Sequence, residues 1–148
     1  MDLSEVEEVR EAAHRILTHA PKGASLMVQR MVKEGIEVIL GGRQDPTFGP
    51  VVMFGLGGVY VEALGEVSFR VAPLTRRDAE EMIAEVQGSQ VLEGIRGARP
   101  ADREGLIRAL IALSRLMTDQ PRVVEIDINP LIVSPEGVVA VDARARVE

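Results

Sequence analysis

The length and composition of the chain predict one globular domain with a real core. It has 148 residues, of which 46% are hydrophobic, and its net charge of −6 at pH 7 argues against general nucleic-acid binding. It contains no cysteine, which excludes a disulfide framework, a thiolate zinc site and a cysteine nucleophile. No apolar run reaches the length of a membrane span and the N-terminus lacks a signal-peptide core, so we expect a cytoplasmic protein without a membrane partner.

A helix is predicted at the start of the chain, followed by strands. Residues Ser4–Glu7 resemble a capping box, and apolar residues then recur at helical spacing as far as Leu17. The segments 25–32 and 36–42 have the apolar pattern of strands. Because Lys33-Glu34-Gly35 lies between them, we expect these two segments to form a hairpin.

A cluster of glycines follows the next predicted strand, at residues 51–54. Because Gly57 and Gly58 have no Cβ, this turn can leave backbone N–H groups free to face a phosphate or a carboxylate. A purely structural turn is the more common meaning of such a sequence. The Gly-Lys-Ser/Thr end of a P-loop does not follow, so the glycines alone do not define a nucleotide site.

Residues 67–73 predict a further strand, which contains Arg70. This residue alternates with Phe69 and Val71, so we expect its side chain to point away from the apolar face of the strand. It is then either an ordinary exposed arginine, which the spacing alone favours, or a cation that faces a phosphate. Weaker candidates of the same kind are Arg43, Arg76 and Arg77.

Two helices are predicted before the final strands, and they complete the fold. Thr75–Asp78 resembles a second capping box, and Asp102 is placed to cap a helix with apolar residues along one face. Residues 88–100 contain three glycines and one proline, which predicts a loop with a short helical turn. We therefore expect an α+β fold, a mainly antiparallel sheet with helices packed on it, rather than a doubly wound parallel sheet.

The end of the chain predicts a hairpin with a tight turn at Ser134–Gly137. With the turn centred in the middle of this tetrapeptide, Asn129 lies opposite Asp142, and Asp127 lies opposite Arg144. Directly opposed side chains in an antiparallel pair are about 4.5–5.5 Å apart at Cβ. The register therefore predicts that these polar side chains share one face.

That face gathers oxygen ligands, at Glu125, Asp127, Asn129 and Asp142. Carboxylate and amide oxygens suit Mg²⁺, which one or two carboxylates usually hold together with phosphates and water. The alternative is a solvated hairpin face with two cross-strand ion pairs, each worth well under ~1 kcal/mol. Asp and Asn disfavour strands, which argues for a role beyond structure.

The other face of this hairpin is expected to be apolar, with Ile126, Ile128 and Ile132 in equivalent positions. Pro130 removes a hydrogen-bond donor beside Asn129. The strand should therefore be an edge strand or be bulged at this point.

Several motifs occur together in one order along residues 28–64, 69–75 and 124–146. The most specific are DPTFGP with FGLGG, and DINPL with VDAR. In this combination the chain resembles the ATP-grasp domain in the β part of ADP-forming acyl-CoA (acetyl-CoA) synthetases. It is more distantly similar to succinyl-CoA synthetase β subunits. The resemblance runs from about the first helix to the end of the chain.

The resemblance implies a reversible reaction in which acyl-CoA, ADP and phosphate give free acid, CoA and ATP. An acyl-phosphate and a phosphohistidine on a partner part would be the intermediates, and Mg²⁺ and ATP or ADP would be bound. The implied metal ligands are Asn129 and Asp142, with Asp127 as an auxiliary ligand. The implied nucleotide-binding residues are Gln29, Arg30 and Met31 beside the adenine, Glu37 beside the ribose, and Gly57 and Gly58. Weak catalytic candidates are Glu62 and Arg70.

The chain also departs from the family pattern. The lysine-bearing strand and the HK…GGV motif of the first ATP-grasp subdomain are not seen ahead of Ser4. We therefore expect residues 1–148 to be a single ATP-grasp-like subdomain that needs the lysine-bearing subdomain and a CoA-binding α-type subunit or domain. The alternative is a non-catalytic regulatory or assembly module with the same fold. The sequence leaves open the acyl group, the choice of ADP or GDP, and the oligomeric state.

Overall fold

The computed structural model describes residues 3–32, 35–58, 66–94 and 97–148, which fall into two units, Met1–Lys33 and Glu34–Glu148. The first unit contains helix α1 (Val6–His19). Its capping box joins Glu5 and Glu8, one residue later than the sequence predicted. Residues 25–32 have no regular secondary structure, so the strand predicted there is wrong. Two residues of the predicted turn, Lys33 and Glu34, lie outside the described residues.

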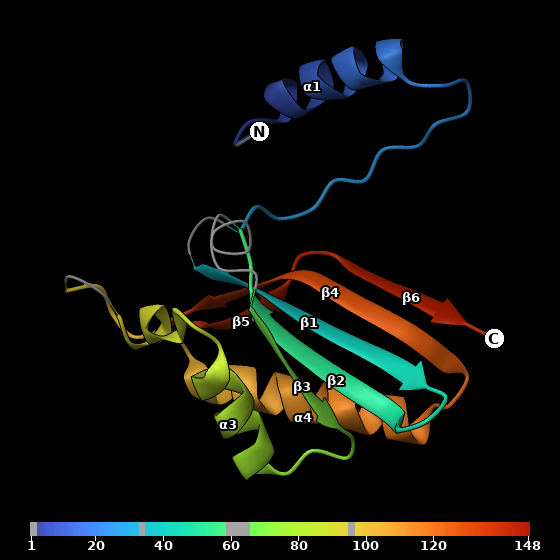
Figure 1. The fold of residues 1–148 in the computed structure, drawn as a ribbon. Helices are drawn as coiled ribbons and strands as arrows, with labels where there is room; N and C mark the ends of the chain where they lie inside the picture. Colours follow the sequence, from blue (N-terminus) through green and yellow to red (C-terminus); the bar gives the residue numbers. More distant parts are fainter. Residues whose placement is uncertain (1–2, 33–34, 59–65, 95–96) are drawn as a thin grey trace. The chain divides into compact units, whose positions relative to one another are not determined.

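The second unit is a six-stranded antiparallel sheet with helices on one face (Figure 1). The strand order is β3-β2-β1-β4-β5, and β6 also pairs with β4. The α+β prediction is therefore confirmed. The strands are β1 (Ile36–Asp45), β2 (Gly49–Leu56), β3 (Val67–Val71), β4 (Val123–Ser134), β5 (Gly137–Ala140) and β6 (Ala143–Val147). The helices are α3 (Arg76–Glu85), the 3₁₀ helix η1 (Ser89–Glu93) and α4 (Arg103–Asp119).

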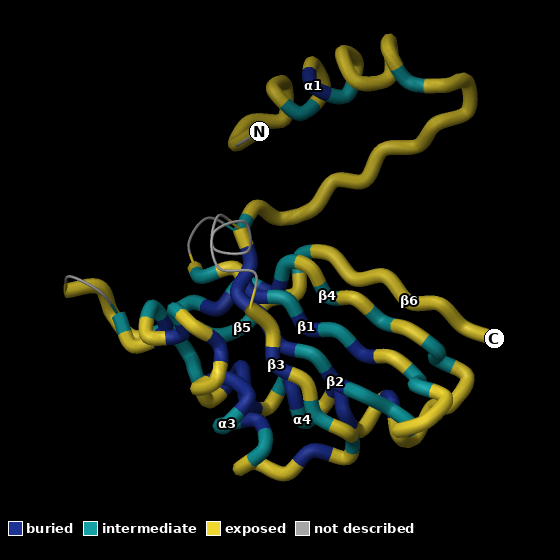
Figure 2. Tube along the Cα trace, viewed as in Figure 1, coloured by how far each residue is buried: buried dark blue, intermediate teal, exposed yellow. Residues whose placement is uncertain are grey.

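The core of this unit lies between the sheet and the helices α3 and α4. Alternate residues of the central strands are buried there, as the dark stretches in Figure 2 show. Phe54 and Leu40 are among the largest fully buried side chains, and Leu110 and Met117 of α4 pack in the same cluster. The alternation follows from the period of a strand, which sends successive side chains to opposite faces.

Both helices begin where the sequence predicted. The Thr75 hydroxyl accepts a hydrogen bond from the Asp78 N–H, and an Asp78 carboxylate oxygen accepts one from the Thr75 N–H at 2.7 Å. Asp102 accepts a hydrogen bond from the Gly105 N–H at 2.8 Å. These caps satisfy N–H groups that have no partner within the helix. None of the described helices has the length and apolar character needed to cross a membrane.

The predicted register of the C-terminal hairpin is confirmed. Ser134 pairs with Gly137, and further from the turn Asp127 pairs with Arg144. Between these points the Asn129 N–H donates a hydrogen bond to the Asp142 carbonyl oxygen at 3.1 Å. The two residues that the sequence placed opposite each other are therefore cross-strand neighbours.

A bulge interrupts β4 at Pro130, where its register with β1 shifts. Before the bulge Ile126 and Ile128 face the core, and after it Leu131 and Val133 do. The predicted bulge is confirmed, although β4 is an interior strand and not an edge. The prediction that Ile132 is equivalent to Ile126 and Ile128 is wrong, because the extra residue of a bulge reverses the alternation.

Candidate functional site

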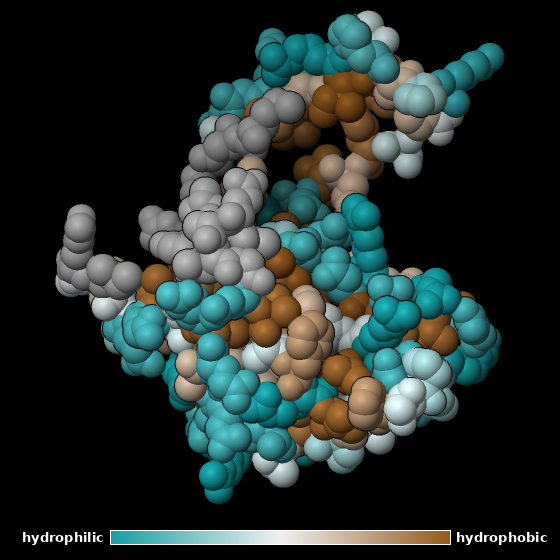
Figure 3. All heavy atoms as spheres, viewed as in Figure 1, coloured by the Kyte–Doolittle hydropathy of each residue, from teal (hydrophilic) through white to brown (hydrophobic). Residues whose placement is uncertain are grey.

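One face of the sheet points away from α3 and α4, and we call it the open face. Gly41 on β1 lies between Met53 on β2 and Asp127 on β4 in one cross-strand row. Arg43 lies in the next row, opposite Glu125. In Figure 3 apolar side chains gather over β2 and β3, whereas most of the surface over β4 and β6 is hydrophilic. The open face therefore has an apolar half and a charged half.

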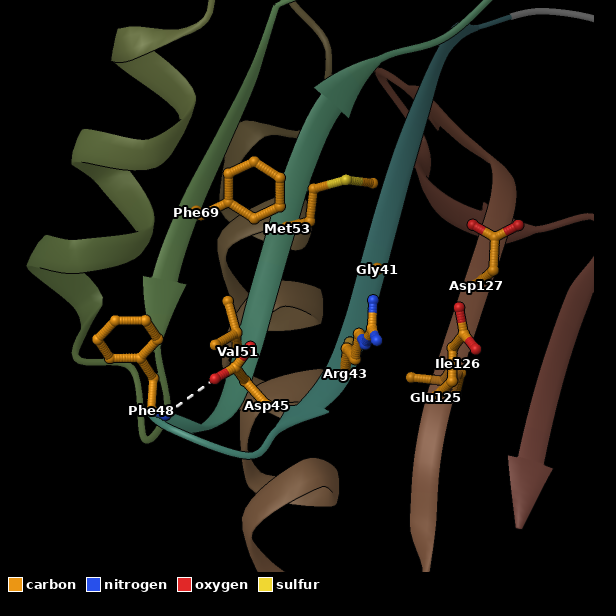
Figure 4. Close-up of a pocket in the computed structure, with 11 residues that line it drawn as sticks. Gly41, Arg43, Asp45, Phe48, Val51, Met53, Phe69, Glu125, Ile126 and Asp127 are labelled. Carbon is orange, nitrogen blue, oxygen red and sulfur yellow. Dashed lines mark hydrogen bonds between the residues drawn. The ribbon is translucent and has the colours of Figure 1, made fainter.

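A hollow of about 510 Å³ lies on this face, near the turn between β1 and β2 (Figure 4). Phe48, Val51, Met53 and Phe69 form its apolar side. Its charged side includes Arg43, Glu125 and Asp127. The apolar side of the hollow was not predicted from the sequence. The sequence feature that could have predicted it is the unbroken apolar run Val51–Phe54. A strand that is apolar on both faces is usually covered on both faces.

The predicted metal ligands lie together on the open face. The Asn129 N–H of β4 donates to the carbonyl oxygen of Asp142, the residue just before β6, and Asp127 lies one cross-strand row away, where it also lines the hollow. All three side chains are exposed. The Arg144 Nε lies 3.6 Å from an Asp142 carboxylate oxygen.

The chemistry of these donors fits Mg²⁺. One amide and two carboxylates are hard oxygen ligands, and Mg²⁺ usually keeps places for phosphates and water. Among the described residues no group of three or more His, Cys, Asp or Glu side chains is arranged as a metal site. A cation at Asn129 and Asp142 would therefore need further ligands, which a nucleotide could supply.

Gly57 and Gly58 pack closely against Glu37. The Gly57 N–H donates to the Glu37 carbonyl oxygen at 2.7 Å, so this N–H is not free for a ligand, as in the structural alternative. A Cβ on Gly57 would lie 3.0 Å from the Glu37 Cβ. Gly58 has a φ of +61°, and a Cβ there would lie 2.9 Å from a Glu37 carboxylate oxygen. The glycines thus bring the Glu37 carboxylate close to the turn after β2.

Arg70 points away from Phe69 and Val71, as the sequence predicted, but those apolar residues are exposed, and Arg70 itself lies on the helix-covered face. Its Nη1 donates to a Glu85 carboxylate oxygen at 3.0 Å, its Nη2 also pairs with Glu85, and Nη2 lies 3.9 Å from Glu81. The Arg70 hydrogen bond is the main cause that lowers the pKa of Glu85. The residues beside it in β3, such as Phe69, are instead exposed on the open face. Arg70 is thus an ion-pair partner of α3.

For the other predicted site residues, those expected beside the adenine and the catalytic candidate Glu62, the structure describes no contact with the open face. Gln29, Arg30 and Met31 belong to the first unit, where they are exposed and lie outside helices and strands. Glu62 lies outside the described residues.

The comparisons with known proteins identify the family. The model of the ATP-grasp domain family matches residues 1–147, so the chain belongs to the ATP-grasp family. It is 50% identical over 119 residues to an ADP-forming acetate–CoA ligase of Archaeoglobus fulgidus, covering 80% of this chain and 17% of that protein. It is 44% identical over 144 residues to the β subunit of an ADP-forming acetate–CoA ligase of Pyrococcus furiosus, covering 93% of this chain and 62% of that subunit.

A solved structure is similar over the whole chain. It is the dinucleotide-forming acetyl-coenzyme A synthetase 1 of Ca. Korarchaeum cryptofilum, in complex with coenzyme A and Mg-AMPPCP, with its phosphohistidine segment pointing towards the nucleotide binding site. The TM-score is 0.90 at 44% sequence identity, and the match covers 100% of this chain and 67% of that one. The fold and the family expected from the sequence are confirmed.

Proposed function

We propose that this chain is the Mg-nucleotide-binding part of an ADP-forming acyl-CoA synthetase. The enzyme would convert acyl-CoA, ADP and phosphate into free acid, CoA and ATP. The family match and the ADP-forming ligases among the relatives support this proposal. Since the chain spans less than two thirds of either of those relatives, other parts must supply the other steps. ATP and CoA are metabolites of the cytoplasm, so the proposal also places the protein there.

The observation that carries the proposal is the pair Asn129–Asp142 on the open face. The Asn129 amide oxygen and the Asp142 carboxylate would hold Mg²⁺, with Asp127 beside them. When bound, the ion would neutralise charge on the nucleotide phosphates, which is most of what phosphoryl transfer requires. Arg144 is close enough to Asp142 to hold its carboxylate in place.

The nucleoside would lie towards the start of β1. Glu37 and Gly58 lie together there, so the Glu37 carboxylate is available to a ribose hydroxyl. Gln29 to Met31 would border the adenine, as the family resemblance implies. The lysine-bearing ATP-grasp subdomain and a CoA-binding subunit or domain would complete the enzyme.

The test is to replace the two ligands separately in the assembled enzyme, in which this chain is combined with its CoA-binding part and the lysine-bearing subdomain. Asn129→Ala and Asp142→Ala should each abolish Mg-dependent ADP binding, measured by titration calorimetry, together with turnover. Glu125→Ala is the matched control, because Glu125 lies on the same face but pairs with Arg146 at 3.6 Å. Equal, small effects of all three changes would contradict the proposal and favour a non-catalytic assembly module.

A further inference from the structure

The features of the open face follow one another in a fixed order along β1. Glu37 and Gly58 lie together near the start of the strand. Asn129 and Asp142 come next, beside the bulge in β4. If the proposed function is right, a nucleotide with its ribose at Glu37 and its metal at Asn129 directs its terminal phosphate towards the turn between β1 and β2.

The hollow begins where that phosphate would end. Gly41 lies opposite Asp127, and Arg43 follows on the same face, opposite Glu125. A strand advances roughly 3.3 Å per residue, so Arg43 lies about 7 Å beyond Gly41. Its long side chain lines the hollow between these two rows.

Arg43 has its guanidinium available for an anion. It is exposed, and it forms no salt bridge with any carboxylate of the residues that the structure describes. Two of its acidic neighbours, Asp45 and Glu125, are engaged elsewhere. An Asp45 carboxylate oxygen accepts hydrogen bonds from the N–H groups of Thr47 at 2.8 Å and Phe48 at 3.0 Å. Glu125 lies 3.6 Å from Arg146.

The pKa of Asp45 is consistent with a carboxylate that is bound by backbone N–H groups and not by Arg43. It is held below its usual value chiefly by the Phe48 and Thr47 hydrogen bonds, and only in small part by the charge of Arg43. The planar fork of an arginine can bind two oxygens of a phosphate at once. Asp45 does not compete for the Arg43 fork, because backbone N–H groups already hold its carboxylate.

The apolar side of the hollow suits a group that must be kept from water. Phe48 and Phe69 are 66% and 54% exposed, although large aromatic side chains are usually buried. A Cβ on Gly41 would lie 3.2 Å from the Met53 Cε, so the glycine keeps the floor of the hollow open. Excluding water strengthens the electrostatic interactions of a transferring phosphoryl group and prevents its hydrolysis.

We propose that Arg43 contacts the phosphoryl group in transit between the nucleotide and its acceptor, and that the hollow is the acceptor side of the site. This proposal rests on the proposed function. In the direction of ATP formation the P–N bond of the partner's phosphohistidine breaks and its electron pair stays on the imidazole nitrogen. A β-phosphate oxygen of ADP forms the new P–O bond. Arg43 neither gains nor loses a proton and stabilises charge on the phosphoryl oxygens.

The test compares Arg43→Met, Arg43→Lys and the control Arg146→Met in the assembled enzyme. Arg146 lies on the same face of the hairpin but is paired with Glu125 and Glu148. The readouts are single-turnover transfer of labelled phosphate from Mg-ATP to the partner's histidine, and the Kd for Mg-ADP. Arg43→Met should slow transfer about 100-fold while changing the Kd for Mg-ADP by less than about twofold. Arg43→Lys should lose less, because it keeps the charge without the fork.

Transfer by Arg43→Met at the rate of Arg146→Met would overturn the proposal. It would also be overturned if Arg43→Met weakened Mg-ADP binding as strongly as Asn129→Ala does, since Arg43 would then bind the nucleotide and not the group in transit. Failure of the proposed function itself is seen separately, as unchanged Mg-ADP binding in the Asn129 and Asp142 variants.

Discussion

Adjacent glycines of β1 offer a test of which face of the sheet is open. Gly42 is buried, and a Cβ there would lie 2.8 Å from both Cγ and Sδ of Met117 and 2.9 Å from the Cγ2 of Ile126. Gly41 faces the hollow, and the three atoms nearest to a Cβ there all belong to the side chain of Met53, at 3.2 Å or more. Alanine at Gly41 should therefore leave the fold as stable as before, whereas alanine at Gly42 should destabilise it.

The magnitude follows from two opposing effects. Overpacking a core costs about 1–3 kcal/mol, and a flexible methionine keeps this cost in the lower half of the range. Replacing glycine by alanine also restricts the unfolded chain, which stabilises by about 0.4–1 kcal/mol. Gly42→Ala should then lower the free energy of unfolding by about 1 kcal/mol. Gly41→Ala should leave it unchanged or raise it by about 0.5 kcal/mol.

Urea denaturation of the two variants measures this difference. With a slope near 2 kcal/mol per molar, the midpoint of Gly42→Ala should fall by roughly 0.5 M, and that of Gly41→Ala should not fall. Equal midpoints, or a lower midpoint for Gly41→Ala, would refute the assignment of the open face.

Four further outcomes are expected. Arg70→Met should leave Mg-ADP binding unchanged in calorimetry, because Arg70 is bound to Glu85 on the helix-covered face. Since this pair lowers the folded-state pKa of Glu85, it stabilises the fold above the unfolded pKa of about 4.3. That contribution is lost as the pH falls through the folded pKa, so the Tm difference between wild type and Arg70→Met should disappear in acid. Asp102→Ala removes the acceptor of the Gly105 N–H and should lower the free energy of unfolding in urea by about 1 kcal/mol. The chain alone should bind Mg-ADP more weakly than a Kd of about 1 µM, or −8 kcal/mol, whereas tighter binding would show that it holds a complete site.

Local signals in the sequence predicted the hairpin and both helix starts. The turn at Ser134–Gly137 sets the register of the strands that flank it, so the pairing of Asn129 with Asp142 could be found without tertiary information. The caps at Thr75 and Asp102 are equally local, because each bonds an N–H three residues away.

The predictions that failed depended on which partner covers a strand. A period of two separates the faces of β3 but does not say which face carries the helices. The apolar residues of β3, such as Phe69, lie on the open face, and Arg70 lies beneath α3. Residues 25–32 have the pattern of a strand but form none, since a pattern alone supplies no neighbouring strand. The prediction that Ile132 shares a face with Ile126 and Ile128 failed because the bulge at Pro130 reverses the alternation of side chains.

The most direct test of the central claim is the position of the metal in crystals of the assembled enzyme grown with ADP and Mn²⁺ in place of Mg²⁺. Anomalous scattering locates the ion independently of the nucleotide. We predict a peak bound by the Asn129 amide oxygen and the Asp142 carboxylate, at distances near the ~2.1 Å of Mg²⁺ sites. A bound nucleotide whose metal lies at Glu125, or away from both Asn129 and Asp142, would contradict the account.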